Sequence, residues 1–365
     1  MTAVRFSACM ADALYGKNGY YIREGERIGR AGDFYTSALV SPVFGELWAS
    51  FALAEFASGT HLAVAELGCG GGDFAEPFVR HLLRADPARS ILYAAIDVAE
   101  PARRRTRERL LRIRPEFRDG EARLEVLAAA TALEAAQLAR GRLGDGFLFA
   151  NELLDALPCD IVRCRGGAAE VLMVEEAAAA GAEEGAGLFA GRSRRTFFTA
   201  AGSGPWLAYA RRYLLPLAGG EPLIAEAQTG LAPAVSEALS ALRPRVAAFV
   251  DYGGRTVDIV GPDRPRGSLR AYRGHRLVDD FLDFPGACDL TYDVDFSALE
   301  DALRSAGYRP RLLERQGPFL VALPAFARLA QERMAARPNA SLAIRQLVMP
   351  GAMGDRFLVS IAGRD

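Results

Sequence analysis

The stretch Val64-Ala-Glu-Leu-Gly-Cys-Gly-Gly-Gly-Asp-Phe74 decides how the fold of this 365-residue chain is interpreted. An apolar run from His61 to Leu67 leads into a turn of glycines, and an amphipathic segment follows from Phe74 to Arg84. Glycines in such a turn allow positive φ angles and let the backbone approach a ligand without interference from a Cβ atom. This order of strand, glycine turn and helix predicts a nucleotide-type binding loop.

Further along the chain, short apolar runs alternate with amphipathic stretches, as in a parallel sheet that helices cover on both faces. We predict strands at residues 91–97, 124–128, 146–150, 245–250 and 309–315, a closing strand at 356–362, and helices at 101–113, 132–140, 295–307 and 319–337. The fold class is therefore expected to be α/β, with a mostly parallel, Rossmann-like sheet.

The predicted strands divide the chain into three parts. Residues 1–60 are interpreted as an N-terminal helical or lid segment, residues 61–159 and 245–365 as the core, and residues 160–244 as an inserted substrate-binding subdomain. Within the insertion we predict a hairpin at 161–165 and 171–175, a low-complexity tip at 175–187 and a helix at 205–217.

Composition excludes several classes of protein. The net charge of -1 provides no global field for nucleic acid, and no run approaches the ~18 apolar residues of a membrane span. The arginine-rich run at 103–114 is interpreted as the exposed face of a helix. Five scattered cysteines favour a reducing compartment, and no metal site is expected at Cys159 and Cys164. The first residues resemble neither a signal peptide nor a transit sequence, so we expect a cytoplasmic protein.

The choice of ligand depends on the carboxylates around the glycine turn. Asp97 ends the second strand, where it can accept hydrogen bonds from both ribose hydroxyls of a nucleoside. Gly70, Gly72 and Ala75 also fit the dinucleotide pattern G-x-G-x-x-A, so a dehydrogenase that uses NAD stays an alternative. However, Glu66 and Asp73 place negative charge where a sulfonium would be tolerated and a diphosphate would not. S-adenosylmethionine is therefore the favoured cofactor.

Polar residues also gather at the end of the fourth strand, in Phe149-Ala-Asn-Glu-Leu-Leu-Asp-Ala-Leu-Pro158. Ligands of open α/β sheets bind beyond the carboxyl ends of the strands, so Asn151, Glu152 and Asp155 are expected to face the reacting centre. Alternatively, Asn151 and Asp155 only cap a helix. Before the core, Gly29-Arg-Ala-Gly-Asp-Phe-Tyr-Thr-Ser37 places aromatic residues between glycines, as a lid over a site would.

In these motifs the chain resembles the MidA-like family of methyltransferases, which includes a mitochondrial arginine methyltransferase needed for complex I assembly. The shared segments are Gly19-Tyr-Tyr, Gly32-Asp-Phe-Tyr-Thr-Ser, Glu66-Leu-Gly-x-Gly, Asn151-Glu-x-x-Asp-Ala-Leu-Pro, Asp251-Tyr-Gly, Leu269-Arg-x-Tyr-Arg-x-His, Pro285-Gly-x-x-Asp-Leu-Thr, Val294-Asp-Phe and Met353-Gly-x-x-Phe. The resemblance implies a class I methyltransferase whose seventh strand returns antiparallel between the fifth and the sixth. It also implies a bacterial cytosolic enzyme, because the chain begins almost on the family's first helix.

The site residues that we expect follow from the motifs and the resemblance together. The expected cofactor-binding residues are Asp33, Tyr35, Thr36, Ser37, Glu66, Gly68, Gly70, Gly72, Asp97, Asn151 and Glu152, and the expected catalytic residues are Glu152, Asp155, Tyr252 and His275. The chain departs from the family at Cys69 and Gly71, at Asp97-Val-Ala, and at Gly167-Ala-Ala-Glu in the insertion. The last departure leaves the identity of the substrate open.

Two kinds of methyl acceptor fit the sequence. A guanidinium or amine needs carboxylates to orient it and take its proton, for which Glu152, Asp155 and Asp251 are candidates. A small carboxylic acid needs cations and donors, and the candidates for these are Arg270, Arg273, His275 and Tyr252. A cofactor-binding assembly factor with little catalysis is a third interpretation, and the sequence is compatible with a homodimer.

Overall fold

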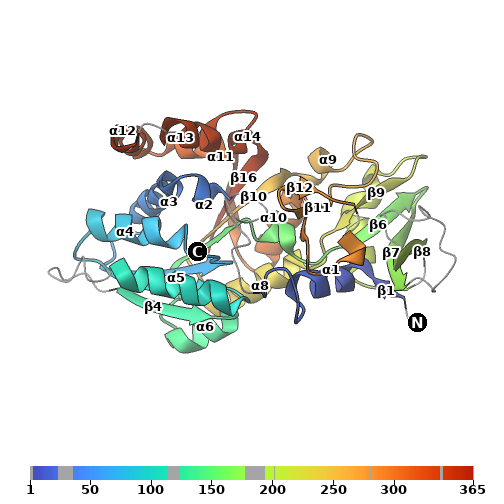
Figure 1. Cartoon of the computed structure of the whole chain (residues 1–365), viewed down its shortest axis with the longest axis horizontal. Helices are drawn as coiled ribbons and strands as arrows, with labels where there is room; N and C mark the ends of the chain where they lie inside the picture. Colours follow the sequence, from blue (N-terminus) through green and yellow to red (C-terminus); the bar gives the residue numbers. More distant parts are fainter. Residues whose placement is uncertain are drawn as a thin grey trace. The chain divides into compact units, whose positions relative to one another are not determined.

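The structure is a computed structural model that describes residues 3–23, 36–113, 124–176, 194–200, 202–279, 281–337 and 340–364 (Figure 1). The chain forms two compact units. The parallel-sheet unit comprises Tyr35–Leu153, Ser236–Tyr252 and Leu303–Asp365. The antiparallel-sheet unit comprises Met1–Phe34, Leu154–Val235 and Gly253–Ala302.

The parallel-sheet unit is built on seven strands in the order β15-β16-β10-β5-β2-β3-β4. These strands are β2 (His61–Leu67), β3 (Ser90–Ile96), β4 (Leu124–Ala129), β5 (Phe147–Asn151), β10 (Val246–Gly254), β15 (Arg309–Arg315) and β16 (Phe357–Gly363). Strand β16 pairs antiparallel with both β10 and β15, whereas β2, β3, β4, β5 and β10 pair in parallel. The predicted mostly parallel sheet with an antiparallel last strand is confirmed.

Both faces of this sheet are buried, because consecutive residues of β5 from Phe147 to Ala150 all have little exposed surface although they point alternately to opposite faces. Aromatic side chains fill one face. Trp48 of α3 (Pro42–Glu55) lies 4.8 Å from Phe149 between ring centroids, and Phe74 stacks on the same ring at 4.0 Å. Helix α3 begins at Pro42, and the side chain of Ser41 caps it by accepting a hydrogen bond from the N–H of Val43.

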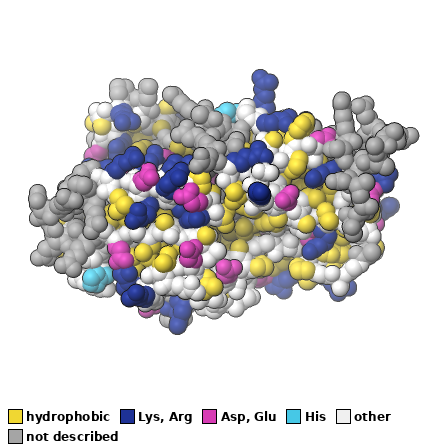
Figure 2. Space-filling view, turned by 60° about the horizontal axis from the view of Figure 1, so that its bottom comes forward, with side chains coloured by type: hydrophobic (Ala, Val, Ile, Leu, Met, Phe, Trp, Pro, Cys, Tyr) yellow, Lys and Arg dark blue, Asp and Glu magenta, His cyan; other side chains and the backbone are white. Residues whose placement is uncertain are grey.

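Helices α4, α5 and α6 agree with the predicted ones. They span Ala75–Ala85, Glu100–Ile113 and Ala132–Ala139. On α5, Arg104 pairs with Glu100 at 3.7 Å and Arg112 with Glu108 at 3.6 Å, each one helical turn apart. On the face drawn in Figure 2, Lys and Arg side chains are likewise interspersed with Asp and Glu side chains. These pairs support the interpretation of the arginine-rich run as an exposed helix face.

The predicted single helix at 319–337 is wrong. The structure has α11 (Gln316–Ala322) and α12 (Phe326–Ala336), which lie near α13 (Ala340–Val348) and α14 (Met353–Arg356) (Figure 1). Leu323 between α11 and α12 has an extended backbone with φ −68° and ψ 128°. The next residue is Pro324, which disfavours a helical conformation in the residue before it and provides no N–H for a helical hydrogen bond.

The antiparallel-sheet unit contains the predicted hairpin. Strands β6 (Asp160–Arg165) and β7 (Ala168–Glu176) pair antiparallel, with Val162 opposite Val171. The sheet is completed by β1 (Val4–Arg5), β8 (Arg194–Thr199) and β9 (Leu223–Ala227). The predicted helix at 205–217 is present as an α-helical turn, α7 (Pro205–Tyr209), followed by a π turn and a 3₁₀ turn. Most of the predicted tip at 175–187 lies outside the described residues.

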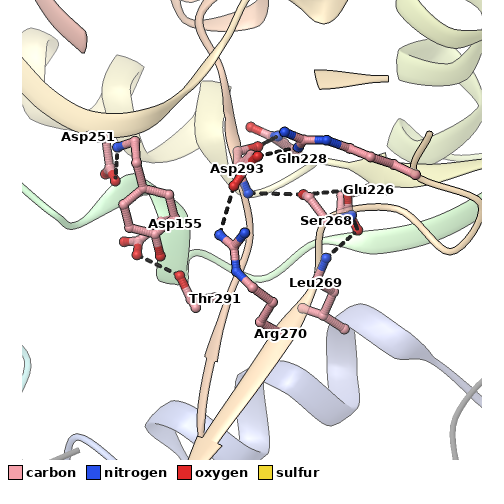
Figure 3. Close-up of polar contacts among 11 residues, drawn as sticks. Asp155, Glu226, Gln228, Asp251, Ser268, Leu269, Arg270, Thr291 and Asp293 are labelled. Atoms are coloured by element: carbon pink, nitrogen blue, oxygen red, sulfur yellow. Dashed lines mark hydrogen bonds and ion pairs between the residues drawn. The ribbon is translucent and has the colours of Figure 1, made fainter. Parts of the chain in front are cut away.

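Residues 253–302 also belong to this unit, which differs from the three-part division expected from the sequence. This segment contains α9 (Thr256–Ile259), β11 (Arg270–Arg273), β12 (Arg276–Leu277), β13 (Asp289–Thr291), β14 (Val294–Asp295) and most of α10 (Phe296–Ser305). The carboxylate of Glu226 in β9 accepts hydrogen bonds from the N–H groups of Ser268 and Leu269, both at 2.8 Å (Figure 3). Gln228 likewise donates to the carbonyl of Asp293 and accepts from the N–H of Asp295. These contacts between distant parts of the chain hold the segment against the insertion.

The other described helices are α1 (Phe6–Tyr15), α2 (Ser37–Val40) and α8 (Leu231–Leu242). Within the described ranges, every helix is too short or too polar to traverse a lipid bilayer.

Candidate active site

The glycine turn after β2 requires its glycines. Gly68, Gly70 and Gly72 have φ angles of 68°, 51° and 85°, a region that other residues adopt at a cost. A Cβ atom on Gly72 would lie 3.1 Å from the Cα of Thr106 in α5. Thr106 in turn donates its hydroxyl to the carbonyl of Gly70 at 3.0 Å. The turn is therefore both conformationally special and packed tightly against α5.

Asp97 follows β3 and faces this turn. One carboxylate oxygen accepts the N–H of Gly70 at 3.0 Å, and the other accepts the N–H of Ala99 at 2.9 Å. Burial raises the pKa of Asp97, while these two backbone hydrogen bonds oppose the rise. A carboxylate has about four acceptor sites, so Asp97 retains the capacity to accept hydroxyl groups of a ligand.

The structure weakens the charge argument made from Glu66 and Asp73. Glu66 is buried in β2 and accepts the hydroxyl of Tyr93 at 2.6 Å, and burial raises the pKa of its carboxyl well above the ordinary value of 4.5. Asp73 forms an ion pair with Arg109 at 2.6 Å. One carboxyl therefore favours its neutral form and the other is compensated, so these charges alone do not select a cationic ligand.

Replacing Glu66 with glutamine is expected to stabilise the fold at about pH 8, and to do so much less at about pH 5. The pKa of Glu66 is higher in the folded protein than in the unfolded chain. The stability that the protonated carboxyl provides is therefore complete below the pKa of the unfolded state, and it is lost as the pH rises through the pKa of the folded state. Glutamine stays neutral and can still accept the hydroxyl of Tyr93. Denaturant unfolding at both pH values measures the difference.

Glu125→Gln is the control with the opposite sign. The hydrogen bond from Arg142 lowers the pKa of the exposed Glu125 carboxyl, and the stability that this provides is lost only as the pH falls below the ordinary value of 4.5. Glu125→Gln should therefore slightly lower stability at both pH values. Equal gains for Glu66→Gln at both pH values would contradict the raised pKa.

The end of β5 presents a second group of polar atoms. Glu152 has a φ of 52°, and its Oε1 accepts the N–H of Ser37 at 2.8 Å and the side-chain amide of Asn151 at 3.0 Å. The amide oxygen of Asn151 is buried and has no hydrogen-bond partner among the described residues. A Cβ atom on Gly68 would lie 3.0 Å from the side chain of Leu153. This end of β5 therefore adjoins the glycine turn and leaves an acceptor for a ligand.

Asp251 lies in the neighbouring strand β10. Its carboxylate accepts the N–H of Leu153 at 3.2 Å and the N–H of Tyr252 at 3.0 Å. The ring of Tyr252 packs edge-on against Phe357, with centroids 5.5 Å apart. Asp251 thus fixes the backbone that follows Glu152, while the Tyr252 ring contacts the last strand.

Only part of the predicted N-terminal segment can be placed, since Asp33 and Tyr35 lie outside the described residues. Thr36 precedes α2, and the N–H of Ser37 contacts Glu152. The Ser37 hydroxyl instead donates to Gln316 at 3.2 Å, and Gln316 donates to the carbonyl of Leu347 at 3.0 Å. Gln316 is not among the residues expected from the sequence, although a glutamine three residues before the apolar run Phe319-Leu-Val-Ala is a visible signal.

The remaining predicted residues belong to the antiparallel-sheet unit. Asp155 accepts the hydroxyl of Thr291 at 2.6 Å, and Arg270 donates to Asp293 at 2.7 Å (Figure 3). The guanidinium of Arg273 lies 5.2 Å from the ring centroid of Phe284, and His275 is exposed in the turn between β11 and β12. The structure thus brings together Ser37, the glycine turn, Asp97, Asn151, Glu152 and Asp251 within the parallel-sheet unit. It does not group Asp155 and His275 with them in that unit.

The described residues contain no group of three or more His, Cys, Asp and Glu side chains suited to a metal ion. The five cysteines are free, and Cys159 and Cys164 are buried.

The fold and these residues define a class of protein, the class I methyltransferases. Its defining features are the antiparallel strand between β10 and β15, the glycine turn after β2 and the aspartate after β3. A family model described as "Putative S-adenosyl-L-methionine-dependent methyltransferase" matches residues 45–312, so the chain belongs to this family and its cofactor is S-adenosylmethionine.

Individual relatives agree with this assignment. The chain is 27% identical, over 355 residues, to "Protein arginine methyltransferase NDUFAF7 homolog, mitochondrial" of Drosophila melanogaster, covering 93% of this chain and 76% of the relative. A crystal structure from Burkholderia thailandensis bound to S-adenosyl-homocysteine superposes with a TM-score of 0.80 at 24% identity, covering 99% of this chain and 88% of that one. A native crystal structure from the same organism superposes with a TM-score of 0.77 at 23% identity, covering 99% of this chain and 87% of that one. These two structures show the fold.

Proposed function

We propose that this methyltransferase modifies a guanidino nitrogen of arginine in a protein substrate. When bound, S-adenosylmethionine supplies a methyl carbon that its sulfonium has already activated. The new C–N bond forms as the C–S bond breaks, and the guanidinium gives up one proton. The protein therefore has to hold the acceptor in line and accept that proton.

The residues around the glycine turn fit the cofactor. The positive-φ glycines would let the backbone approach it, and Asp97 has acceptor sites left for the ribose hydroxyls. The buried amide oxygen of Asn151 accepts no hydrogen bond from any described residue, and it would accept one from an N–H group of the ligand.

The choice of arginine as the methyl acceptor rests on the position of the Glu152 carboxylate. Donors from Ser37 and Asn151 both bind Oε1, so the side chain is held in place at the carboxyl end of β5, beside the glycine turn. A fixed carboxylate can accept a charge-assisted hydrogen bond from a guanidinium and take its proton. The name of the Drosophila relative is consistent with this acceptor.

A small carboxylic acid is less well supported as the acceptor. Among the cations expected to bind it, Arg270 is already paired with Asp293, and Arg273 lies over Phe284. A carboxylate acceptor near Glu152 would also face a like charge, which costs free energy.

Radioactive methyl transfer from S-adenosylmethionine tests the proposal. We expect label in arginine-containing proteins or peptides, methylarginine in their hydrolysates, and no label in matched peptides with lysine in place of arginine. Base-labile label in small carboxylic acids would instead identify methyl esters and overturn the choice of acceptor. Binding of S-adenosylhomocysteine without transfer to either acceptor class would favour the assembly-factor interpretation.

A further inference from the structure

A cavity of about 370 Å³ lies in the parallel-sheet unit, where β10 and β15 begin and β16 ends. Four arginines, Arg245, Arg309, Arg311 and Arg364, and one carboxylate, Glu55, line it. The glycine turn, Asp97 and Asn151 lie at the opposite, carboxyl ends of the parallel strands. The cavity is therefore separate from the candidate active site.

The charges around this cavity do not balance. Arg311 pairs with Glu55 through two hydrogen bonds, both of 2.8 Å, and Arg364 pairs with Asp145. Arg245 donates to the backbone carbonyl of Glu55 at 2.5 Å, and its guanidinium lies 4.2 Å from the ring centroid of Phe56. Neither Arg245 nor Arg309 forms an ion pair with a carboxylate in the described part of the chain. Two positive charges at the cavity are thus left without an acidic partner among the residues that the structure describes.

Such a cavity favours an oxyanion. Guanidinium groups bind carboxylate and phosphate through parallel N–H donors, and they lose less hydration free energy than ammonium groups when they do so. A concave surface with one sign of excess charge also concentrates the electric field that attracts counter-ions. The volume is within the range of small-molecule sites, roughly 300–1,000 Å³. Phe56 and Glu55 hold two of the guanidiniums in place before any ligand arrives.

We propose that this arginine cavity binds a small dianion through its phosphate or carboxylate oxygens, independently of the cofactor. The ligand is not S-adenosylmethionine, whose sulfonium would meet like charge there.

Calorimetric titration of the full chain with inorganic phosphate, and separately with succinate, tests the proposal at constant ionic strength. Binding of phosphate alone would identify a phosphate-bearing ligand, and binding of succinate alone a dicarboxylate; either result supports the site. No saturable binding of either anion up to about 10 mM would overturn it, since this corresponds to less than about 3 kcal/mol of binding free energy.

Arg309→Gln is the informative variant, because Arg309 forms no ion pair with any described residue and is exposed at the start of β15. We expect the variant to bind the anion about tenfold more weakly or worse, with unchanged affinity for S-adenosylhomocysteine. The matched control is Arg345→Gln, an exposed arginine on α13 away from the cavity. Equal anion affinity in the two variants, or loss of anion binding in saturating S-adenosylhomocysteine, would refute a separate arginine site.

Discussion

Replacing Gly72 with valine is expected to weaken the binding of S-adenosylhomocysteine by about a hundredfold or more. The residue has a φ of 85°, which a β-branched side chain rarely adopts. Its Cβ would also lie 3.1 Å from the Cα of Thr106 and 3.2 Å from the side chain of Arg109. Because Thr106 binds the carbonyl of Gly70, relief of this contact has to move the turn itself. Calorimetric titration of the purified variant measures the loss.

Gly141→Val separates the local effect from general backbone strain. Gly141 has a similar φ of 78°, but a Cβ there would meet no atom within 4 Å. This control should lose some stability and keep its affinity for the ligand. Thermal unfolding shows whether each variant is folded, and Gly72→Ala provides a milder substitution if the valine variant is not. Affinity within about threefold of wild type in a folded Gly72→Val protein would rule out this turn as the cofactor site.

Glu152→Gln is expected to lower kcat for arginine methylation by about 10²- to 10⁴-fold, with little change in the KM for S-adenosylmethionine. Glutamine keeps the size of the side chain, and its oxygen can still accept the N–H groups that Ser37 and Asn151 provide. The substitution removes the negative charge that would orient the guanidinium and receive its proton. Steady-state kinetics with an arginine peptide separate the two parameters.

The control for this variant is Glu332→Gln, an exposed glutamate on α12 that pairs with Arg328. We expect wild-type kinetics from it, because exposed ion pairs contribute little. A Glu152→Gln enzyme with full activity would contradict the proposed role of Glu152 and would favour an acceptor that needs no carboxylate.

Local patterns in the sequence were sufficient for most of the parallel-sheet unit. The glycine turn and the apolar run before it predicted β2 and its turn, because both depend on residues close together in the chain. The hairpin of β6 and β7 was predicted for the same reason. The amphipathic pattern continues across Pro324 and so predicts one helix, whereas the proline ends α11 and the structure has two.

The position of residues 253–302 could not be predicted in this way. Their attachment to the insertion depends on Glu226 and Gln228, whose partners lie between 42 and 67 residues further along the chain. The spacing of residues along the chain does not show which buried polar groups will form hydrogen bonds with one another.

By itself, the sequence determined the α/β class, the strand that carries the glycine turn, and the motifs that mark the methyltransferase family. Only the tertiary structure decided which charges remain available: Glu66 is buried against Tyr93, Asp73 is paired with Arg109, and Arg270 with Asp293. It also assembled the arginine cavity from residues between Glu55 and Arg364. The physical reason is that ion pairing, hydrogen bonding and desolvation depend on distances in space, which the spacing of residues along the chain does not specify.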